Sequence, residues 1–294
     1  MWHYLCILLF TVVSYNVENL FDNRHDSLKN DYEYTADGDR HWSYQRMENK
    51  CENIAKVICI IGEGTPPAIV GLCEVENDRC LQMLCQKMPI YPYKPIHFES
   101  EDERGVDVAM LCDTTQFFPM DAAPLHVDLG EDKTRDILFV KGVELASKDT
   151  LFCFVCHLPS MLGGKAASEW KRQKAKSVIQ NKIDSLLLDD SNARIVVMGD
   201  MNCGPEDDIH QMTNRMLVWA NANVGSHRYN GIWTCLDQFY VSQALLNASV
   251  RIFDADFLLC EDTKFLGKKP RRTFVGFNYD RFGYSDHLPI VLSW

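Results

Sequence analysis

The sequence has no hydrophobic run long enough to cross a membrane. Its longest mainly apolar stretch is Leu5–Val13, whereas a transmembrane helix needs about 20 apolar residues. It also has no internal repeat and no low-complexity linker. With 46% hydrophobic and 24% charged residues, the 294-residue chain has an ordinary globular composition. These features exclude a disordered, collagen-like or multi-pass membrane protein, and they predict a single domain over residues 1–294.

Basic residues are scarce relative to acidic ones. The chain has 30 Lys and Arg against 41 Asp and Glu, which gives a net charge of −11. Tight binding to a polyphosphate depends on basic contacts, so this balance argues against unassisted, high-affinity nucleic-acid binding. A phosphate substrate remains compatible with the charge if a divalent cation lies between the protein and the phosphate.

No closely spaced cysteines suit a metal site or a disulfide scaffold. The twelve cysteines are scattered, and a chain of this length needs no such scaffold for stability. Cys153 and Cys156 lie in a strand-like run, where residues three apart point to opposite faces and cannot share one metal. We expect most of the cysteines to be reduced core residues. Scattered disulfides in an exported protein are the alternative.

The first residues, MWHYLCILLF, lack two features of a secretory signal. There is no basic n-region and no small-residue cleavage site before Ser14. We therefore interpret Tyr4–Ser14 as a buried strand and favour a cytoplasmic protein over a periplasmic or exported one. The sequence indicates no obligate protein partner, and we expect a monomer.

Strand-like runs outnumber helical ones. Each run is short, rich in Val, Ile, Leu and Phe, and ends near a polar or turn residue. The runs are LCILLFTVVSY, AIVGLCEV, VDVAMLCD, DILFVKGVEL, TLFCFVCHL, RIVVMGD, LDQFYVS and LPIVLSW. Helical periodicity predicts helices over Trp42–Ile61, Asn77–Met88, Ala166–Leu188 and Asp207–Ala220. This balance favours an α/β protein whose sheets pack on one another over a simple alternating wound sheet.

Polar residues that can do chemistry follow many of these strands. Carboxyl ends of strands are where α/β proteins expose binding groups. The residues are Asn16, Glu74, Glu76, His157, Asp200, Asn202, Asp237, Asp286 and His287. Several strands that each deliver an acid, amide or imidazole to one rim indicate an active site, whereas one such residue would mean little.

Each motif alone also has a purely structural interpretation. Asn16 in YNVEN fits a turn at a strand end. Glu74 in GLCEVEN fits a helix N-terminal charge as well as a metal ligand. A lone His157 at the end of a strand is more often a satisfied structural histidine than a ligand. The single motifs therefore leave both interpretations open.

Two further motifs have a chemical interpretation that depends on local geometry. In extended backbone, Asp200 and Asn202 of GDMN project to the same side, so one can act on a water while the other holds a phosphate oxygen. The same Gly-Asp-x-Asn pattern is also a good turn. In SDH, Asp286 next to His287 can fix the imidazole tautomer and stabilise its cation, as a general base requires.

The joint pattern is more specific than any of its parts. The segments SYNVENLFD, GLCEVEN, RGVDVAML, TRDIL, GDMN, LDQF and SDHLPI resemble the endonuclease/exonuclease/phosphatase superfamily, which has the DNase I-like fold, and its bacterial members in particular. The resemblance runs from about Ser14 to the C-terminus. It implies a four-layer sandwich of two mixed β-sheets packed face to face with helices on the outside. It also implies divalent-metal-dependent hydrolysis of a phosphoester bond.

The resemblance further implies roles for the residues of the rim. Glu74 is expected to bind Mg²⁺ or Mn²⁺, with Asn16 nearby. Asp200 is expected to orient or deprotonate the attacking water. Asn202 and His157 are expected to donate hydrogen bonds to the phosphate, as oxyanion-stabilising groups do.

Four other residues complete the implied site. His287, held by Asp286, is expected to lie against the scissile phosphate or the nucleophile. Asp237 is expected near the metal or the leaving group. Arg104 in ERGVD and Arg135 in TRDIL are candidates to hold phosphate oxygens.

Two cysteines depart from the family pattern. Cys156 precedes His157 where close relatives often have Asn, and Cys203 follows Asn202. We interpret both as packing residues. If they were exposed, they would make the enzyme sensitive to oxidation.

The motifs indicate the reaction and leave the substrate open among nucleic acid, small phosphoesters and lipid phosphoesters. The basic segment Lys165–Lys182 fits a solvated helix face, and Lys264–Arg272 is a loop that could approach the site. Acidic stretches at Asp31–Asp39, Glu99–Asp107 and Asp128–Asp136 oppose them. The charge therefore disfavours a tight non-specific nuclease. A non-catalytic protein that binds a phosphate ligand on the same scaffold is the alternative to an enzyme.

Overall fold

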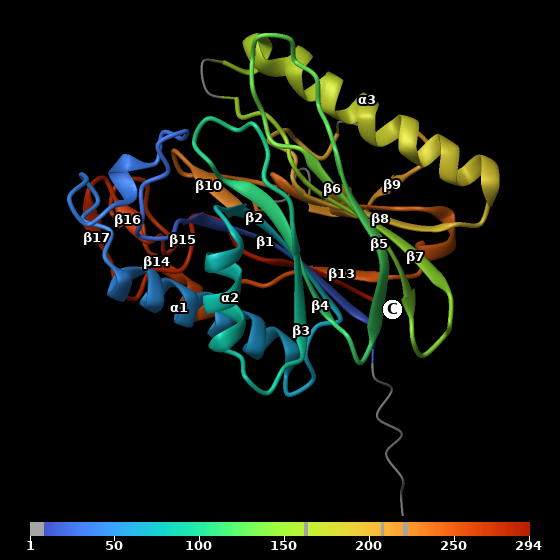
Figure 1. The fold of residues 1–294 in the computed structure, drawn as a ribbon, viewed down its shortest axis with the longest axis horizontal. Helices are drawn as coiled ribbons and strands as arrows, with labels where there is room; N and C mark the ends of the chain where they lie inside the picture. Colours follow the sequence, from blue (N-terminus) through green and yellow to red (C-terminus); the bar gives the residue numbers. More distant parts are fainter. Residues whose placement is uncertain (1–8, 162–163, 207–208, 220–222) are drawn as a thin grey trace, which may run out of the picture.

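The computed structural model describes residues 9–161, 164–206, 209–219 and 223–294, and two six-stranded sheets form its centre (Figure 1). The first sheet has the order β13-β18-β1-β2-β4-β3 and the second β5-β6-β7-β8-β12-β9. The pairs β1–β2 and β7–β8 are parallel, and the other pairs within the described sheets are antiparallel. Both sheets are therefore mixed, as expected.

The strand bounds are as follows. The first sheet consists of β1 (Thr11–Leu20), β2 (Ile69–Val75), β3 (Tyr93–His97), β4 (Asp107–Asp113), β13 (Ser249–Ile252) and β18 (Ile290–Ser293). The second consists of β5 (Phe117–Leu125), β6 (Ile137–Glu144), β7 (Thr150–His157), β8 (Arg194–Asp200), β9 (Thr213–Asn214) and β12 (Asp237–Val241). Small hairpins pair β10 (His227–Tyr229) with β11 (Ile232–Thr234), β14 (Leu259–Glu261) with β15 (Lys268–Pro270), and β16 (Phe274–Val275) with β17 (Asn278–Tyr279).

Helices cover the outer faces of both sheets. The α-helices are α1 (Tyr44–Gly62), α2 (Asp78–Gln86) and α3 (Lys165–Asp189), and short 3₁₀ turns are η1 (Tyr32–Tyr34), η2 (Arg215–Trp219), η3 (Gln243–Leu245) and η4 (Asp256–Leu258). Figure 1 shows α1 and α2 on the side of the first sheet and α3 on the side of the second. The expected four layers, two mixed sheets packed face to face with helices on the outside, are confirmed.

Three apolar clusters hold these layers together. The side chains of α1 and α2 pack on the outer face of the first sheet, as Ile54 does in the cluster that contains Leu72. The two sheets meet in a second cluster that contains Val155 and Met198. On the far side, Ile179 of α3 packs in a cluster with strand residues of the second sheet. Each Å² of apolar surface removed from water stabilises the folded state by about 25 cal/mol. The packing between these layers is therefore the main source of stability.

Strand β8 shows why the apolar runs of the sequence are uninterrupted. Ile195 and Val197 join the cluster beneath α3, whereas Val196 and Met198 face the other sheet. A strand buried on both faces needs apolar residues at every position. The sheets also approach closely, because a Cβ on Gly71 would lie 2.8 Å from Met198 Sδ.

The predicted helices agree with the structure in three cases and fail in one. The helices expected over Trp42–Ile61, Asn77–Met88 and Ala166–Leu188 are α1, α2 and α3. The helix expected over Asp207–Ala220 is wrong for its described part, which holds β9 and η2; residues 207, 208 and 220 lie outside the described residues. Pairing of β9 with β12 overrides the weak helical periodicity of that segment.

The first strand also differs from its predicted extent. It begins at Thr11 and ends at Leu20, and residues 4–8 of the predicted strand lie outside the described residues. Asn16 therefore lies within β1 rather than after it. The other seven predicted strand runs all correspond to strands.

The basic face expected on α3 is only partly solvated. Lys174 is exposed, but Arg172 is fully buried and Lys176 is 6% exposed. Arg172 Nη1 donates to the Pro159 carbonyl at 3.2 Å and thereby ties the helix to the end of β7. None of the helices in the described part of the chain is long and apolar enough to cross a membrane.

Candidate active site

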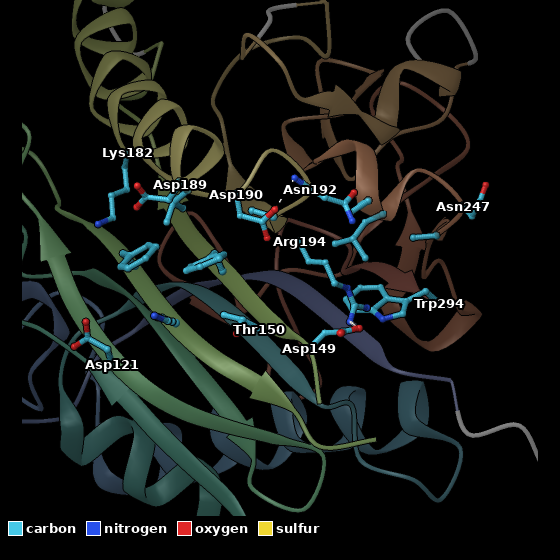
Figure 2. Close-up of a pocket in the computed structure, with 18 residues that line it drawn as sticks. Asp121, Asp149, Thr150, Lys182, Asp189, Asp190, Asn192, Arg194, Asn247 and Trp294 are labelled. Carbon is cyan, nitrogen blue, oxygen red and sulfur yellow. Dashed lines mark hydrogen bonds and ion pairs between the residues drawn. The ribbon is translucent and has the colours of Figure 1, made fainter. Parts of the chain in front are cut away.

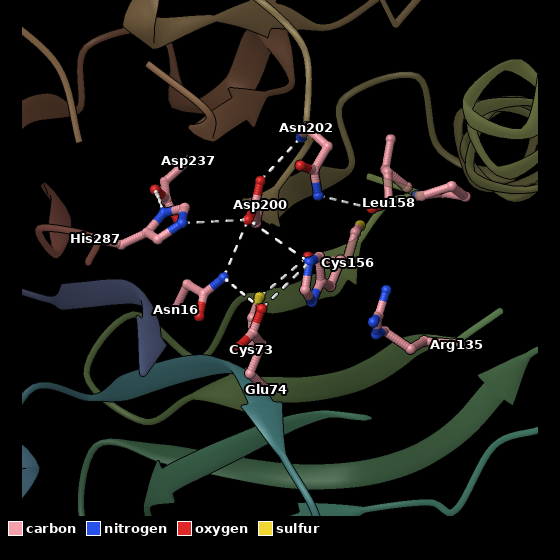
Figure 3. Close-up of polar contacts among 12 residues, drawn as sticks. Asn16, Cys73, Glu74, Arg135, Cys156, Leu158, Asp200, Asn202, Asp237 and His287 are labelled. Carbon is pink, nitrogen blue, oxygen red and sulfur yellow. Dashed lines mark hydrogen bonds and ion pairs between the residues drawn. The ribbon is translucent and has the colours of Figure 1, made fainter. Parts of the chain in front are cut away.

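Three predicted site residues surround the carboxylate of Asp200 at the end of β8 (Figure 3). Its Oδ2 atom accepts a hydrogen bond from Asn16 Nδ2 at 3.1 Å. The same oxygen lies 3.6 Å from His157 Nε2 and 3.8 Å from His287 Nε2. The parallel pairs β1–β2 and β7–β8 bring their carboxyl-terminal parts together here, so residues from both sheets share one site.

Glu74 enters the site because its strand is irregular at that point. It has a left-handed φ of 66°, and the register of β2 against β4 shifts around it. A bulge of this kind re-aims a side chain. Glu74 Oε1 lies 3.4 Å from Asn16 Nδ2 and 3.9 Å from His157 Nε2. Glu74 Oε2 accepts from the Asn19 amide at 2.9 Å, which holds the carboxylate in place.

His287 is held by Asp237, and the expectation that Asp286 holds it is wrong. The Nδ1 atom of His287 lies 2.7 Å from Asp237 Oδ2. Asp237 reaches this position because it pairs with Asp200 in the register of β12 against β8. Asp286 Oδ2 instead lies 3.1 Å from Arg272 Nη2. Adjacent residues in the chain point in different directions, so the neighbouring acid is not the one that contacts the ring.

Burial and charge give the titratable groups of this site different protonation tendencies. Burial, with help from Asp237, raises the pKa of Asp200 to about 6 against the opposing charge of His287. Burial alone would lower the pKa of His287, but Asp237, Asp200 and Asp286 outweigh it and raise that pKa well above its usual value.

The second imidazole behaves in the opposite way. Burial, together with the charges of Arg135, Arg104 and His287, holds the pKa of His157 well below its usual range. The site thus combines a carboxyl group that titrates near neutrality, a cationic imidazole and a neutral imidazole. Such separated pKa values are typical of acid–base sites.

Asn202 reaches the site by a route that differs from the extended geometry predicted. The backbone leaves β8 at Asp200, and Asn202 has a left-handed φ of 48°. Its backbone N–H donates to Asp200 Oδ1 at 2.9 Å, and its Nδ2 donates to the Leu158 carbonyl at 2.9 Å. The turn, rather than strand alternation, therefore places Asn202 beside Asp200 (Figure 3).

The two predicted arginines have different surroundings. Arg104 Nη2 lies 3.8 Å from Glu74 Oε1, and its side chain is 47% exposed, so it can reach a ligand at the site. Arg135 is buried: its Nε donates to the Val106 carbonyl at 3.1 Å and its Nη2 lies 3.2 Å from Asp102 Oδ2. Two nitrogens of Arg135 therefore contact the segment that contains Asp102 and Val106. Its role in binding phosphate stays a prediction.

A second layer of charged groups supports the site, and the sequence interpretation missed it. Glu18 is buried and accepts from Arg272 Nε at 2.9 Å and from the Thr273 amide at 2.7 Å. The fully buried Lys50 lies 3.9 Å from Glu18 and donates to the Tyr284 carbonyl at 2.6 Å. Glu18 belongs to the SYNVENLFD motif, which was the one signal that could have identified it.

His227 is a further residue of the site that the sequence interpretation missed. It forms an isolated antiparallel bridge with His287, and the two ring centroids are 4.7 Å apart. Burial and the charge of His287 lower the pKa of His227 to about 4. It lies in the three-residue strand β10, which is too short for any periodic signal.

The two cysteines beside the site are packing residues. Cys156 and Cys203 are both fully buried, and both belong to the cluster beneath α3. Burial raises the pKa of the Cys156 thiol. A buried thiol with a raised pKa is unreactive, so the exposure needed for oxidation sensitivity is missing at both positions. On β7, Cys153 faces the other sheet, which confirms that it cannot share a metal with Cys156.

A large cavity of about 940 Å³ lies away from this site (Figure 2). Thr150 and Arg194 line it at the amino-terminal ends of β7 and β8, opposite to the ends that carry His157 and Asp200. Arg194 is paired with Asp149 at 2.9 Å. Cavity size therefore does not identify the chemical site in this protein.

The donor set at Glu74 fits a divalent cation. Glu74 Oε1 and Asp200 Oδ2 are carboxylate oxygens that approach the same Asn16 amide nitrogen, and hard oxygen ligands suit Mg²⁺ and Mn²⁺. Asn16 Oδ1 already accepts from the Glu18 amide at 3.0 Å. Its own role as a metal ligand therefore stays a prediction.

The chain matches one protein family by sequence and several solved structures by fold. A sequence profile described as "Endonuclease/Exonuclease/phosphatase family" matches residues 11–294. No curated protein sequence matches the chain significantly. Solved structures with a similar fold include truncated Caenorhabditis elegans TDP2, with a TM-score of 0.62, 15% identity, and coverage of 97% of this chain and 96% of that one.

Two other solved structures with a similar fold are a sulfate-bound catalytic domain and a phosphatase. The human Nocturnin catalytic domain with a bound sulfate anion has a TM-score of 0.60 and 16% identity, and covers 97% of this chain and 93% of that one. A mannosyl-6-phosphatase from Bacteroides thetaiotaomicron has a TM-score of 0.61 and 15% identity, with 96% and 98% covered. At these identities the similarity establishes the fold alone.

Proposed function

The chain belongs to the endonuclease/exonuclease/phosphatase family, and on that premise we propose that it is a divalent-metal-dependent hydrolase of phosphoester bonds. One observation carries the proposal: the Asp200 carboxylate faces Asn16, His157 and His287 within 3.8 Å. Glu74 lies on the other side of Asn16 and His157. Acid, imidazole and amide groups thus surround one small volume, as a site for in-line water attack on phosphorus requires.

Asp200 is the group that we assign to the attacking water. Its pKa of about 6 leaves it ionised at neutral pH and still basic enough to accept a proton. Asn16 Nδ2 donates to Oδ2 of Asp200, and the backbone N–H of Asn202 donates to Oδ1. These two hydrogen bonds hold the carboxylate in a single orientation. A fixed carboxylate can direct a water at phosphorus without a reorganisation cost.

Three groups are placed to stabilise the negative phosphate oxygens. His287, held cationic by Asp237, offers Nε2–H as a charged donor. His157 is neutral, and its Nε2 faces the centre of the site. Asn202 Nδ2 donates one N–H to the Leu158 carbonyl, and a side-chain amide has a second N–H that can donate to a phosphate oxygen.

Glu74 is the residue that we assign to the cation, together with neighbouring oxygens of Asp200 and Asn16. A divalent ion bound there would withdraw charge from a phosphate oxygen and stabilise the leaving oxygen. Arg104, 3.8 Å from Glu74 Oε1 and half exposed, is placed to contact a phosphate that enters the site.

For the substrate, we infer a small or lipid-headgroup phosphoester in preference to duplex DNA. The basic segment Lys264–Arg272, which the sequence suggested to be a loop, contains strand β15 and offers little uncompensated charge. Lys268 lies 2.6 Å from Asp256, Lys269 lies 3.6 Å from Asp262, and Arg271 lies 2.7 Å from Asp280. Arg272 is paired with Glu18 and Asp286 in the site itself. Such pairing, with a net charge of −11, leaves few free cations for a phosphate backbone.

The first test is hydrolysis of bis-p-nitrophenyl phosphate, p-nitrophenyl phosphate and supercoiled plasmid in Mg²⁺ or Mn²⁺. We expect metal-dependent turnover of a small ester that EDTA and Asp200→Asn both abolish. If the folded protein binds metal but hydrolyses none of the three, the alternative of a non-catalytic phosphate-binding protein takes precedence.

Salt dependence separates the two substrate classes. Binding of duplex DNA releases counterions, so KM for plasmid should rise steeply between 50 and 200 mM salt. Hydrolysis of a small ester should change little over the same range. Efficient plasmid nicking with a steep salt dependence would contradict our choice of a small phosphoester.

A further inference from the structure

Two neighbouring hairpin turns expose large apolar side chains. Tyr229 and Ile232 flank the turn between β10 and β11, and Phe265 and Leu266 lie in the turn between β14 and β15. Their exposed fractions range from 40% to 77%. The two turns are in contact, because a Cβ added to Gly231 would lie 2.8 Å from Phe265 Cβ, and β10 lies beside β15 (Figure 1). We call these four side chains, Tyr229, Ile232, Phe265 and Leu266, the apolar tip.

Arg228 holds the two turns in a fixed relation. Its side chain is almost buried, and its Nη1 lies 3.0 Å from Asp262 Oδ2. The same guanidinium donates from Nη2 to the Leu266 carbonyl at 2.8 Å and from Nε to the Gly231 carbonyl at 3.2 Å. Asp262 Oδ1 also accepts from the Phe265 amide at 3.2 Å. The hydrogen bonds of both turns therefore present the apolar tip as one surface.

The backbone at Leu266 is unusual for an exposed residue. Its φ of 60° lies in the left-handed region, which leucine rarely adopts and which glycine or asparagine occupies more readily. Its side chain is 77% exposed, so apolar packing within the described chain offsets little of this cost. Neither local backbone preference nor the core accounts for leucine at this position. A contact outside the chain does, since contiguous exposed apolar side chains mark interaction sites.

The composition of the apolar tip fits a lipid interface. Lys264 is exposed next to it, with Nζ 4.9 Å from the centroid of the Phe265 ring, and has no ion pair among the described residues. Apolar side chains at the centre, with a tyrosine and a lysine at the edge, are typical of segments that lie at a membrane surface. A stable protein interface instead uses about 20–30 residues on each partner, far more than two turns supply.

The charges around the apolar tip favour a zwitterionic over an anionic lipid surface. Lys268 lies 2.6 Å from Asp256, and Lys269 lies 3.6 Å from Asp262. Paired lysines gain little from anionic lipids, and the net charge of −11 opposes an anionic surface. The binding free energy must therefore come mainly from insertion of apolar side chains.

The bases of the two hairpins lie at the catalytic site. Tyr229 is two residues from His227, whose ring lies 4.7 Å from that of His287. Arg272 follows β15 by two residues and lies 3.1 Å from Asp286. A surface bound at the apolar tip would therefore lie close to the rim of the site.

We propose that the apolar tip docks the protein onto a zwitterionic lipid surface. Leu266 and Ile232 enter the region of the lipid chains, and Tyr229 and Lys264 stay at the level of the headgroups. Docking brings the site close to headgroup phosphoesters, which favours these among the small and lipid substrates. That last step rests on the proposed function, whereas docking itself does not.

Co-sedimentation of the full chain with phosphatidylcholine vesicles measures docking. We expect the wild-type protein to bind, with little change when salt is raised and no gain when phosphatidylserine is added. Leu266→Asn should weaken binding by about 10-fold or more, because one inserted apolar side chain is lost. Asparagine suits the left-handed φ, so the melting temperature should stay the same or rise. Ile232→Ser should weaken binding by a similar factor.

Two control variants change apolar residues that are equally exposed outside the apolar tip. Leu188→Asn lies near the end of α3, and Ile90→Ser lies between α2 and β3. Both should bind vesicles as the wild type does. Equal vesicle binding by wild type and Leu266→Asn would contradict the proposal, and so would a folded wild type that binds no phosphatidylcholine vesicles.

Two other results would also overturn zwitterionic docking. Binding that needs phosphatidylserine and disappears at high salt would assign it to charge. A dimer in light scattering that Leu266→Asn dissociates would assign the apolar tip to a second copy of the chain. Turnover of bis-p-nitrophenyl phosphate is measured on the same samples. Vesicle binding without turnover would support docking and contradict the proposed function, and turnover without vesicle binding would do the reverse.

Discussion

The Nδ1 atom of His287 lies 2.7 Å from Asp237 Oδ2, and this contact turns Nε2 of the ring towards Asp200. Asp237 is fully buried, and its backbone N–H is bonded to Ser226 Oγ at 3.1 Å. The acid therefore has a fixed position, and it fixes the tautomer and the orientation of the imidazole. This arrangement makes His287 a charged donor, because a buried carboxylate stabilises the imidazolium.

Asp237→Asn should reduce turnover by about 10²–10⁴-fold, because the amide no longer stabilises the imidazolium or selects its tautomer. The pKa of His287 is raised chiefly by Asp237 against the effect of burial, so it should fall in the variant. NMR titration of the imidazole C–H signals measures this pKa, and steady-state kinetics measures turnover.

Asp286→Asn is the matched control for that substitution. Asp286 also raises the pKa of His287, but its effect on that pKa is smaller than the effect of Asp237. Asp286 forms an ion pair with Arg272. The fall in the pKa of His287 should therefore be smaller than in Asp237→Asn. An equal or larger fall in Asp286→Asn would mean that the acid next in the chain is the true partner of the ring.

Asp200→Asn should lower hydrolysis by at least about 10²–10³-fold, and His287→Ala by a similar factor, with both proteins folded. Asparagine cannot accept the proton of the attacking water. Burial disfavours the charge of Asp200 and raises its pKa to about 6, so the neutral amide should leave the melting temperature unchanged or higher. Near-normal turnover in a well-folded Asp200→Asn protein would end the assignment of the site.

Glu74→Gln should lose Mg²⁺ binding and turnover together. The substitution keeps the shape of the side chain and the acceptor for the Asn19 amide, but it removes the charge that holds a divalent ion. Calorimetric titration with Mg²⁺ measures the first effect and ester hydrolysis the second. Arg104→Gln is the matched comparison, since Arg104 lies 3.8 Å from Glu74; it should raise KM and leave Mg²⁺ binding intact.

Strands buried on both faces were the most predictable part of the fold. β8 and β7 appear in the sequence as unbroken apolar runs because each alternate residue faces a different buried layer. The short hairpins β14–β15 and β16–β17 gave no such signal, and tertiary contacts decide strands of two or three residues. The same reason accounts for β9, where pairing with β12 replaced the predicted helix.

The candidate site was predictable where a polar residue ends or interrupts a buried strand, as at Glu74, His157 and Asp200. Partners that are distant in the chain were not. Asp237 lies 50 residues from His287 and is brought to it by the pairing of β12 with β8, whereas the sequence favoured the adjacent Asp286. His227 reaches the site through an isolated bridge, for which the sequence carries no pattern.

Glu76, just after β2, gives a prediction for the pH dependence of stability. It is 6% exposed, and burial, with Asp22, Asp31 and Glu99 nearby, raises its pKa to about 8. The folded protein therefore holds a proton on Glu76 that the unfolded chain releases at lower pH. Because stability falls with pH wherever the folded state binds more protons, this residue destabilises the fold progressively between about pH 4.5 and pH 8.

Glu76→Gln should remove that loss. The amide oxygen can still accept from the Asp22 N–H, which lies 2.5 Å from Glu76 Oε2, but no buried charge forms as the pH rises. We expect the variant to exceed the wild type in unfolding free energy by at least about 1 kcal/mol at pH 8 and by little at pH 5. Urea denaturation at both pH values measures the difference. Glu131 is exposed and serves as the control, since Glu131→Gln should have the same stability as the wild type at both pH values. If Glu76→Gln were no more stable than the wild type at pH 8, the Glu76 carboxylate would have to be stabilised by its surroundings in the folded protein.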